Sequence, residues 1–108
     1  MEISIRNLEN YLAHRYGGWG KEESMFMKLV EEIGEVAEVL NKKAGRKVNN
    51  EENINEQLGI ELADMLHYIV AIAALNDLDL ERIILEKDKK ASVKYHHDIN
   101  LEQFLQNN

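Results

Sequence analysis

Residues 28–40 read KLVEEIGEVAEVL, and residues 61–64 read ELAD. Each stretch contains an acid followed three residues later by a second acid: Glu32 with Glu35, and Glu61 with Asp64. Residues three apart are neighbours on one side of an α-helix. Each stretch therefore predicts a helix that carries a pair of carboxylates, and the two helices together predict a four-carboxylate site.

The two acid pairs have the same phase relative to the apolar stripes of their helices. At roughly 100° per residue, these stripes are Leu29, Ile33, Val36 and Leu40 in the first helix, and Leu58, Leu62, Met65 and Ile69 in the second. On each helix the first acid lies about 80° from the stripe and the second about 140°. If the helices pack antiparallel about a local two-fold axis, the pairs face each other at the margin of a bundle. Glu31 and Glu38 point further outward and are expected to be solvated unless substrate or a partner covers them.

Composition indicates an all-α fold. The chain has 108 residues, of which 44% are hydrophobic, and we expect one domain over residues 1–108. It contains no cysteine, which excludes disulfides and thiolate metal sites, and no proline. The absence of proline and the helical spacing of the apolar residues leave little support for strands.

Charge and hydropathy set the expected partners and location. The net charge of −7 argues against binding to DNA or RNA backbones, which a basic face recognises. An acidic protein that handles a polyanion needs a cation between the two. We recognise neither a signal peptide nor an apolar run long enough to span a bilayer, so we expect a cytoplasmic protein that does not contact a membrane.

The helix signals divide the chain into four main helices. These are expected over residues 4–14, 21–43, 55–75 and from 80 into the mid-nineties, with a short amphipathic piece at 101–105. Gly45 is expected to end the second helix, and Asp79 is expected to cap the fourth. The polar residues 46–56 predict a surface loop.

The segment 68–75 (YIVAIAAL) is apolar on every side. Such a helix is usually buried all round. A monomer of this size can hardly cover it, so we expect an antiparallel four-helix bundle assembled as a homo-oligomer, either a homodimer or a homotetramer.

Trp19 and Lys87 are unusual for their positions. Trp19 lies among three glycines, where its ring either stacks on a ligand or packs over the bundle end. Lys87 falls in the apolar stripe of the fourth helix, where its ammonium either reaches carboxylates or a bound phosphate, or extends to solvent at the bundle edge. Both alternatives remain open for each residue. The adjacent His96 and His97 diverge by roughly 100° in a helix and are interpreted as surface residues.

Four carboxylates predict a site for a hard divalent cation. Mg²⁺ prefers oxygen ligands and is commonly shared between protein carboxylates and substrate phosphates. We therefore expect Mg²⁺, with Mn²⁺ as a possible substitute. Such a site can bind a triphosphate, polarise a phosphoryl oxygen and lower the pKa of the water that attacks phosphorus.

At these residues the chain resembles the MazG-like nucleoside triphosphate pyrophosphohydrolases, an all-α family. The shared pattern is two adjacent glutamates, Glu31 and Glu32, a third at Glu35, and the downstream Glu61 and Asp64. The resemblance extends over about residues 16–95. It implies an oligomeric helical bundle that uses Mg²⁺ to convert a nucleoside triphosphate to the monophosphate and pyrophosphate.

The resemblance also implies roles for individual residues. Its metal ligands would be Glu32, Glu35, Glu61 and Asp64. Its catalytic residues would be Glu31 and Glu32, with Glu31 assisting a metal or the attacking water. Lys87 and Lys90 stand where the family often has phosphate-binding lysines, although Ala91 replaces the asparagine that commonly follows. The predicted substrate-binding residues are Trp19, Lys28, Lys87 and Lys90.

Three alternatives remain. Within the same fold, the enzyme could be a phosphoribosyl-ATP pyrophosphohydrolase or have a dUTPase-like specificity. A non-catalytic helical dimerisation or binding module would show no metal dependence. A carboxylate-bridged di-iron bundle would use Asp64 and His67 as its acid-x-x-His element, but that fold needs the element twice and the sequence contains it once.

Overall fold

The computed structural model of the chain describes residues 1–17, 22–46 and 53–107. These residues form five helices and no β-strand: α1 (Ile5–Tyr16), α2 (Glu22–Lys43), α3 (Ile54–Leu75), α4 (Leu80–Lys94) and α5 (Leu101–Gln106). The all-α prediction is confirmed, and each helix lies close to its predicted range. Trp19 lies outside the described residues.

Local capping explains where the helices begin and end. The Asp79 side chain accepts a hydrogen bond from the Arg82 backbone N–H at 3.2 Å, which confirms the predicted cap of α4. Gly45 follows the end of α2 with a φ of +79°, a left-handed conformation that glycine adopts without strain. Asn100 and Gln103 form a capping box at the start of α5.

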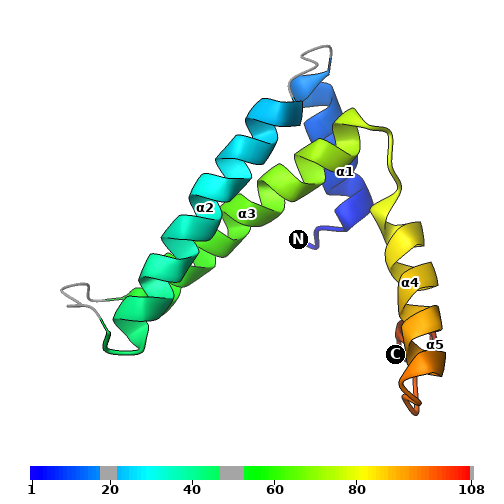
Figure 1. Ribbon diagram of the computed structural model, residues 1–108. Coiled ribbons are helices and arrows are strands. Elements are labelled where there is room, and N and C mark those ends of the chain that lie inside the picture. Colours follow the sequence, from blue (N-terminus) through cyan, green and yellow to red (C-terminus); the bar gives the residue numbers. More distant parts are fainter. Residues whose placement is uncertain (18–21, 47–52, 108) are drawn as a thin grey trace.

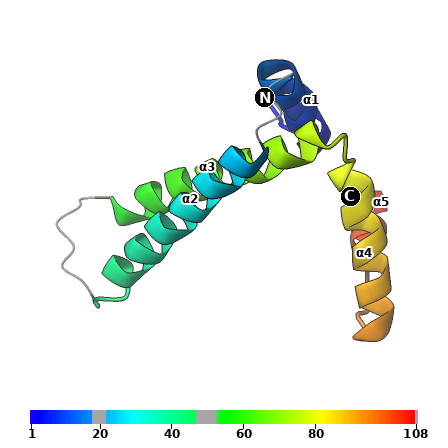
Figure 2. The ribbon, with the colours of Figure 1, turned by 45° about the horizontal axis from the view of Figure 1, so that its top comes forward.

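The chain has the shape of a V with two unequal arms (Figures 1 and 2). In the first arm α2 and α3 lie antiparallel, and α1 packs against the carboxyl-terminal part of α3. The chain then turns at residues 76–79, and α4 leads away with α5 folded against it. In a single chain α4 therefore packs mainly against α1 and α5, and a closed four-helix bundle would need helices from a second copy.

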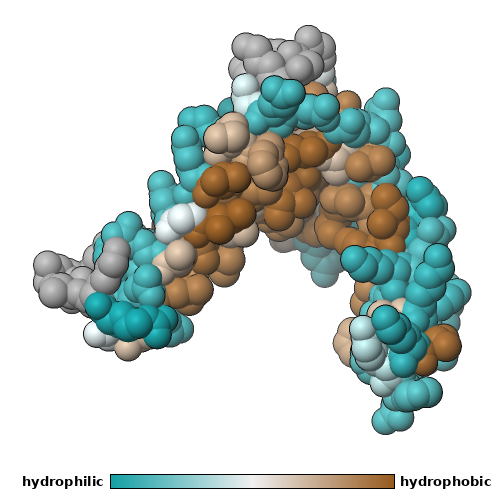
Figure 3. Space-filling model, in the orientation of Figure 1, coloured by the Kyte–Doolittle hydropathy of each residue, from teal (hydrophilic) through white to brown (hydrophobic). Residues whose placement is uncertain are grey.

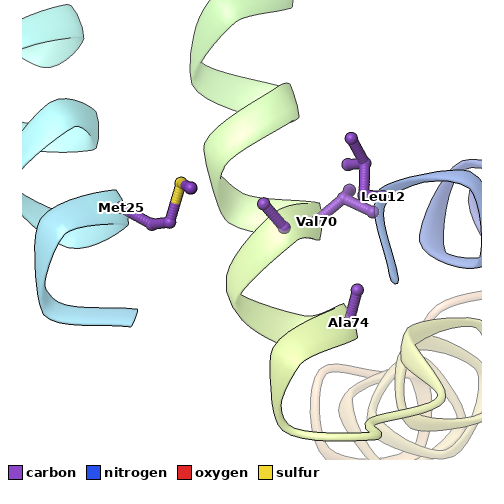
Figure 4. Close-up of a cluster of buried hydrophobic side chains, with 5 residues drawn as sticks. Leu12, Met25, Val70 and Ala74 are labelled. Atoms are coloured by element: carbon purple, nitrogen blue, oxygen red, sulfur yellow. The ribbon is translucent and has the colours of Figure 1, made fainter. Parts of the chain in front are cut away.

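The core lies where α1, α2 and α3 meet. Leu12, Met25, Val70, Ala71 and Ala74 form its buried cluster, and Figure 4 shows Met25 and Leu12 approaching α3 from opposite sides. The small side chains of α3 let its neighbours approach closely. This core orients α2 against α3 and fixes α1 on the far side of α3.

The predicted apolar stripes are only partly covered in one chain. Ile33 on α2 is 48% exposed, and Leu62 and Ile69 on α3 are 47% and 42% exposed. Figure 3 shows apolar side chains gathered in a band along the α2–α3 pair and into the hollow between the arms. Within the segment 68–75, Val70 is buried as predicted but Ile69 is not. We call the exposed apolar residues of the α2–α3 pair, among them Ile33, Leu62, Leu66 and Ile69, the open apolar face.

The prediction that no apolar run is long enough to span a bilayer is wrong for α3. Its length and composition are sufficient to cross a membrane, a criterion that the core helix of a soluble protein also meets. Glu61 and Asp64 lie within this helix, and ionisable side chains inside a bilayer are costly. The helix also contributes four buried residues to the packing against its neighbours.

A polar joint connects α1 to α4. The Glu9 carboxylate, 3% exposed, accepts a hydrogen bond from the Leu80 backbone N–H at 3.1 Å and lies 3.6 Å from the Arg6 guanidinium. In return, the Arg6 backbone N–H donates to Glu81 at 3.1 Å. Glu9 satisfies a backbone donor at the start of α4. The direction of the second arm therefore depends on a buried acid that the sequence pattern did not single out.

Candidate metal centre

The antiparallel packing of α2 and α3 brings their acids together. Glu32 on α2 and Glu61 and Asp64 on α3 place one carboxylate oxygen each so that the three atoms lie within 4.8 Å of one another. Glu61 and Asp64 come from successive turns of α3, as their spacing of three residues requires. Two helices thus supply one cluster of oxygen atoms.

Partial burial of two of these carboxylates raises the free-energy cost of keeping them ionised. Glu32 and Glu61 are half-buried, and each has an Oε2 atom that is shielded from solvent and has no hydrogen-bond partner among the described residues. A buried carboxylate oxygen without a donor destabilises the folded state. A proton or a cation between the carboxylates would remove this penalty.

Glu35 joins the cluster through Glu61. A hydrogen bond with the Glu35 side chain is the largest cause that raises the pKa of Glu61 to about 7. A hydrogen bond with Glu32, burial, and the negative charges of Glu35 and Glu32 raise this pKa further. Glu35 and Glu32 thus both act on Glu61, and Asp64 lies beside Glu61 in the same cluster.

The donor set suits a hard cation. Glu32, Glu61 and Asp64 offer carboxylate oxygens, the ligand type that Mg²⁺ prefers, and Glu35 lies against Glu61. Among the described residues, His67 is not part of this cluster, and its Nε2 lies 2.9 Å from the Tyr16 hydroxyl. The geometry supports a divalent cation held by oxygen ligands.

A family model for the MazG nucleotide pyrophosphohydrolase domain matches residues 21–97. The chain belongs to this family. No curated protein and no solved structure matches it. The family match confirms the resemblance predicted from the acid motifs, and it extends over α2, α3 and α4.

The other predicted residues of the MazG site that the structure describes are divided between α2 and α4. Glu31 is exposed, one position before Glu32, and its carboxylate is 3.9 Å from the ammonium of Lys28. Lys87 and Lys90 are exposed on α4, which points away from the α2–α3 pair in the same chain (Figures 1 and 2). Lys28 therefore lies on α2 with Glu31 and Glu32, whereas the two α4 lysines lie on the other arm.

One contact beside the MazG acids was missed by sequence reasoning. His67 had been considered only as an iron ligand, whereas the structure places it against Tyr16, the last residue of α1. The available signal was its spacing: His67 follows Asp64 by three residues and therefore shares its side of α3. No sequence pattern indicated which residue of α1 would reach it.

Proposed function

We propose that this protein is a Mg²⁺-dependent nucleoside triphosphate pyrophosphohydrolase, which releases pyrophosphate and leaves a nucleoside monophosphate. Membership in the MazG family supports the reaction class. The observation that carries the proposal is the cluster of Glu32, Glu61 and Asp64, which each offer a carboxylate oxygen within 4.8 Å of the others. Glu32 and Glu61 also have a buried oxygen without a donor in the part of the chain that the structure describes. An acidic cluster of this kind can bind a triphosphate only through a cation.

The chain's own residues would divide the work as follows. Glu32, Glu35, Glu61 and Asp64 would hold Mg²⁺, or Mn²⁺ in its place. The bound cation supplies charge stabilisation at phosphorus and a more acidic water. Glu31 is exposed beside this group and its only ion pair among the described residues is a long one, so its carboxylate could orient or deprotonate the attacking water. Lys28 lies next to Glu31 and would contact the phosphates.

We also propose a homodimer or homotetramer in which a second copy covers the open apolar face. Two α2–α3 pairs packed in this way would make an antiparallel four-helix bundle from two chains. Lys87 and Lys90 would then reach a triphosphate if α4 of one copy lies over the acid cluster of the other. The net charge of −7 supports a small nucleotide as the partner instead of a nucleic acid, and a cytoplasmic location remains part of the proposal.

A product assay tests the reaction. The purified protein is incubated with Mg²⁺ and a panel of ribo- and deoxyribonucleoside triphosphates that includes dUTP and phosphoribosyl-ATP, and the products are separated by chromatography. Monophosphate plus pyrophosphate is the expected outcome, and EDTA should abolish it. Diphosphate plus orthophosphate would contradict the proposed bond cleavage, and no turnover across the panel would favour a non-catalytic helical module.

A further inference from the structure

Aromatic side chains continue the acid cluster at the end nearest α1. His67 and Tyr68 follow Asp64 by three and four residues, which places them on the same side of α3, roughly 5 Å further along the helix axis. The Tyr16 hydroxyl lies 2.9 Å from His67 Nε2. The ring of His67 meets Tyr16 and Tyr68 edge to face, at centroid distances of 5.8 Å and 5.1 Å.

The packing of α1 explains why Tyr16 reaches this position. Leu12 lies in the core cluster with Val70 and Ala74, while Tyr16, four residues later, contacts the earlier residue His67. The end of α1 therefore lies beside His67, one helical turn of α3 from Asp64. Tyr16 and His67 are each half-buried, so part of each ring faces solvent beside the acids.

The opposite end of the acid cluster has a different character. The aromatic residues of α2 and α3 are Phe26 and Tyr68, and both lie on the α1 side of the acids. Beyond Glu35 and before Glu61 these helices carry aliphatic and polar side chains only. A nucleotide held by its phosphates must extend its base and sugar toward one end, and the α1 end provides both ring surfaces and hydrogen-bonding groups.

We propose that His67 contacts the nucleoside moiety of the substrate and that Tyr16 is a positioning residue that orients the imidazole through their hydrogen bond. This inference rests on the proposed function and adds a determinant of nucleoside binding to it. The pair lies beside the acids proposed to hold Mg²⁺ without belonging to them. It should therefore affect the binding of a nucleotide but not the binding of its phosphate chain alone.

The experiment compares a nucleotide with a nucleoside-free phosphate chain. Michaelis constants are measured with the best triphosphate of the panel, and Mg²⁺-tripolyphosphate is measured as a competitive inhibitor. The variants are His67→Phe, which keeps a ring but removes both nitrogens, and Tyr16→Phe, which removes only the hydroxyl. Tyr11→Phe is the matched control, because Tyr11 is exposed on the same helix and its hydroxyl accepts a hydrogen bond from Arg15.

We expect His67→Phe to raise KM about 10-fold and Tyr16→Phe about 3-fold, with kcat and the inhibition constant of tripolyphosphate changed less than about 2-fold. Tyr11→Phe should match the parent in every constant. Thermal melts identify a variant that has lost stability, and His67→Gln, which keeps a polar side chain, then replaces His67→Phe and should raise KM less.

Two outcomes would overturn the inference while leaving the proposed function intact. The first is an unchanged KM in the His67 and Tyr16 variants of an active enzyme. The second is a parallel rise in KM and in the tripolyphosphate constant, which would mean that the pair shapes the metal centre as a whole. If the parent protein hydrolyses no triphosphate, the proposed function fails first and this inference fails with it.

Discussion

The two arms of the molecule use acidic residues differently. In the α4–α5 arm the acids have partners: Glu86 lies 3.2 Å from Arg82, and Glu102 lies 3.0 Å from Lys89. Asp88 accepts a hydrogen bond from the Leu101 backbone N–H at 2.6 Å. These exposed or half-exposed pairs cap and connect helices and contribute little free energy of folding individually.

In the α2–α3 arm, Glu32, Glu35, Glu61 and Asp64 face one another instead. Glu32 and Glu61 each shield an oxygen that has no hydrogen-bond partner among the described residues, and Glu35 and Glu32 raise the pKa of Glu61 to about 7. No basic side chain forms an ion pair with Glu32, Glu61 or Asp64 within the described parts of the chain. A repulsive group of this kind is expected where it serves a function, so the comparison separates acids that support the structure from acids proposed to hold a cation.

Replacing one acid in each arm tests this comparison most strongly. Asp64→Asn should lower pyrophosphate release at least about 100-fold, because a metal ligand is lost. In EDTA its melting temperature should equal or exceed that of the parent, because the substitution removes one of the charges that repel one another. Glu86→Gln is the matched control in the other arm and should keep nearly full turnover.

Both halves of this prediction are measurable with one pair of assays. Thermal melts in EDTA and in Mg²⁺ report stability, and pyrophosphate release reports activity. Turnover retained by Asp64→Asn would remove it from the metal centre. A large loss of melting temperature in EDTA would show that Asp64 supports the fold instead.

A second pair of variants compares the apolar surfaces of the two arms. Leu66 is 47% exposed on the open apolar face, and Val93 is 75% exposed on α4. Leu66→Asp should weaken self-association at least about 50-fold, because an interface would have to bury an unpaired carboxylate. Val93→Asp should leave the assembly unchanged.

Light scattering after size-exclusion chromatography measures this effect. The parent should have a mass two or four times the 12.5 kDa of one chain. A parent that is monomeric at micromolar concentration would contradict the proposed assembly, and equal behaviour of both variants would place the interface elsewhere.

The positions of the helices could be predicted from the sequence, because the signals that begin and end a helix are local. Apolar spacing located the helices, and Asp79 and Gly45 marked ends that the structure confirms. The arrangement of the helices was harder to predict. The direction of α4 depends on the long-range contact between Glu9 and Leu80, which no spacing within one helix encodes.

The same distinction applies to the candidate site. Two acid pairs with equal helical phase were enough to predict that Glu32, Glu61 and Asp64 would meet, since an antiparallel pair of helices brings matched faces together. The contact between Tyr16 and His67 joins different helices and has no repeating pattern. In the proposed assembly a second copy covers the apolar stripes, and a single sequence does not give the position of that copy.

The clustered acids of the α2–α3 arm should differ from the ion-paired acids of the α4–α5 arm in their dependence on pH. Since its neighbours raise the pKa of Glu61 to about 7 from the ordinary 4.5, the folded protein holds this proton more tightly than the unfolded chain does. Without metal, the resulting stabilisation is complete below pH 4.5 and is lost as the pH rises through about 7. Mg²⁺ must displace the proton, so its affinity should rise by up to about 10-fold per pH unit below that pKa and level off above it.

Calorimetric titration with Mg²⁺ between pH 6 and pH 8 measures this affinity, and melts in EDTA over the same range measure the loss of stability. Glu35→Gln removes the charge that contributes to the raised pKa of Glu61 and should flatten both profiles. Glu102→Gln, in the other arm, should leave both profiles unchanged. An affinity that is independent of pH would show that the carboxylates do not share a proton.

The smallest expected effect concerns the lysines of α4. Lys89 is held by Glu102 at 3.0 Å, whereas Lys87 forms no ion pair within residues 1–17, 22–46 and 53–107 and lies in the apolar register of its helix. If α4 covers the acid cluster of a second copy, Lys87 is the lysine available to a phosphate. Lys87→Ala should then raise KM about 3- to 5-fold, and Lys89→Ala should change it less than about 2-fold, because an exposed ion pair contributes little.

Steady-state kinetics of both variants at several salt concentrations test this, since added salt should weaken the contribution of Lys87 by screening its charge. Equal small effects of the two substitutions would exclude Lys87 from substrate binding and would leave Lys90 as the lysine of α4 proposed to contact the phosphates.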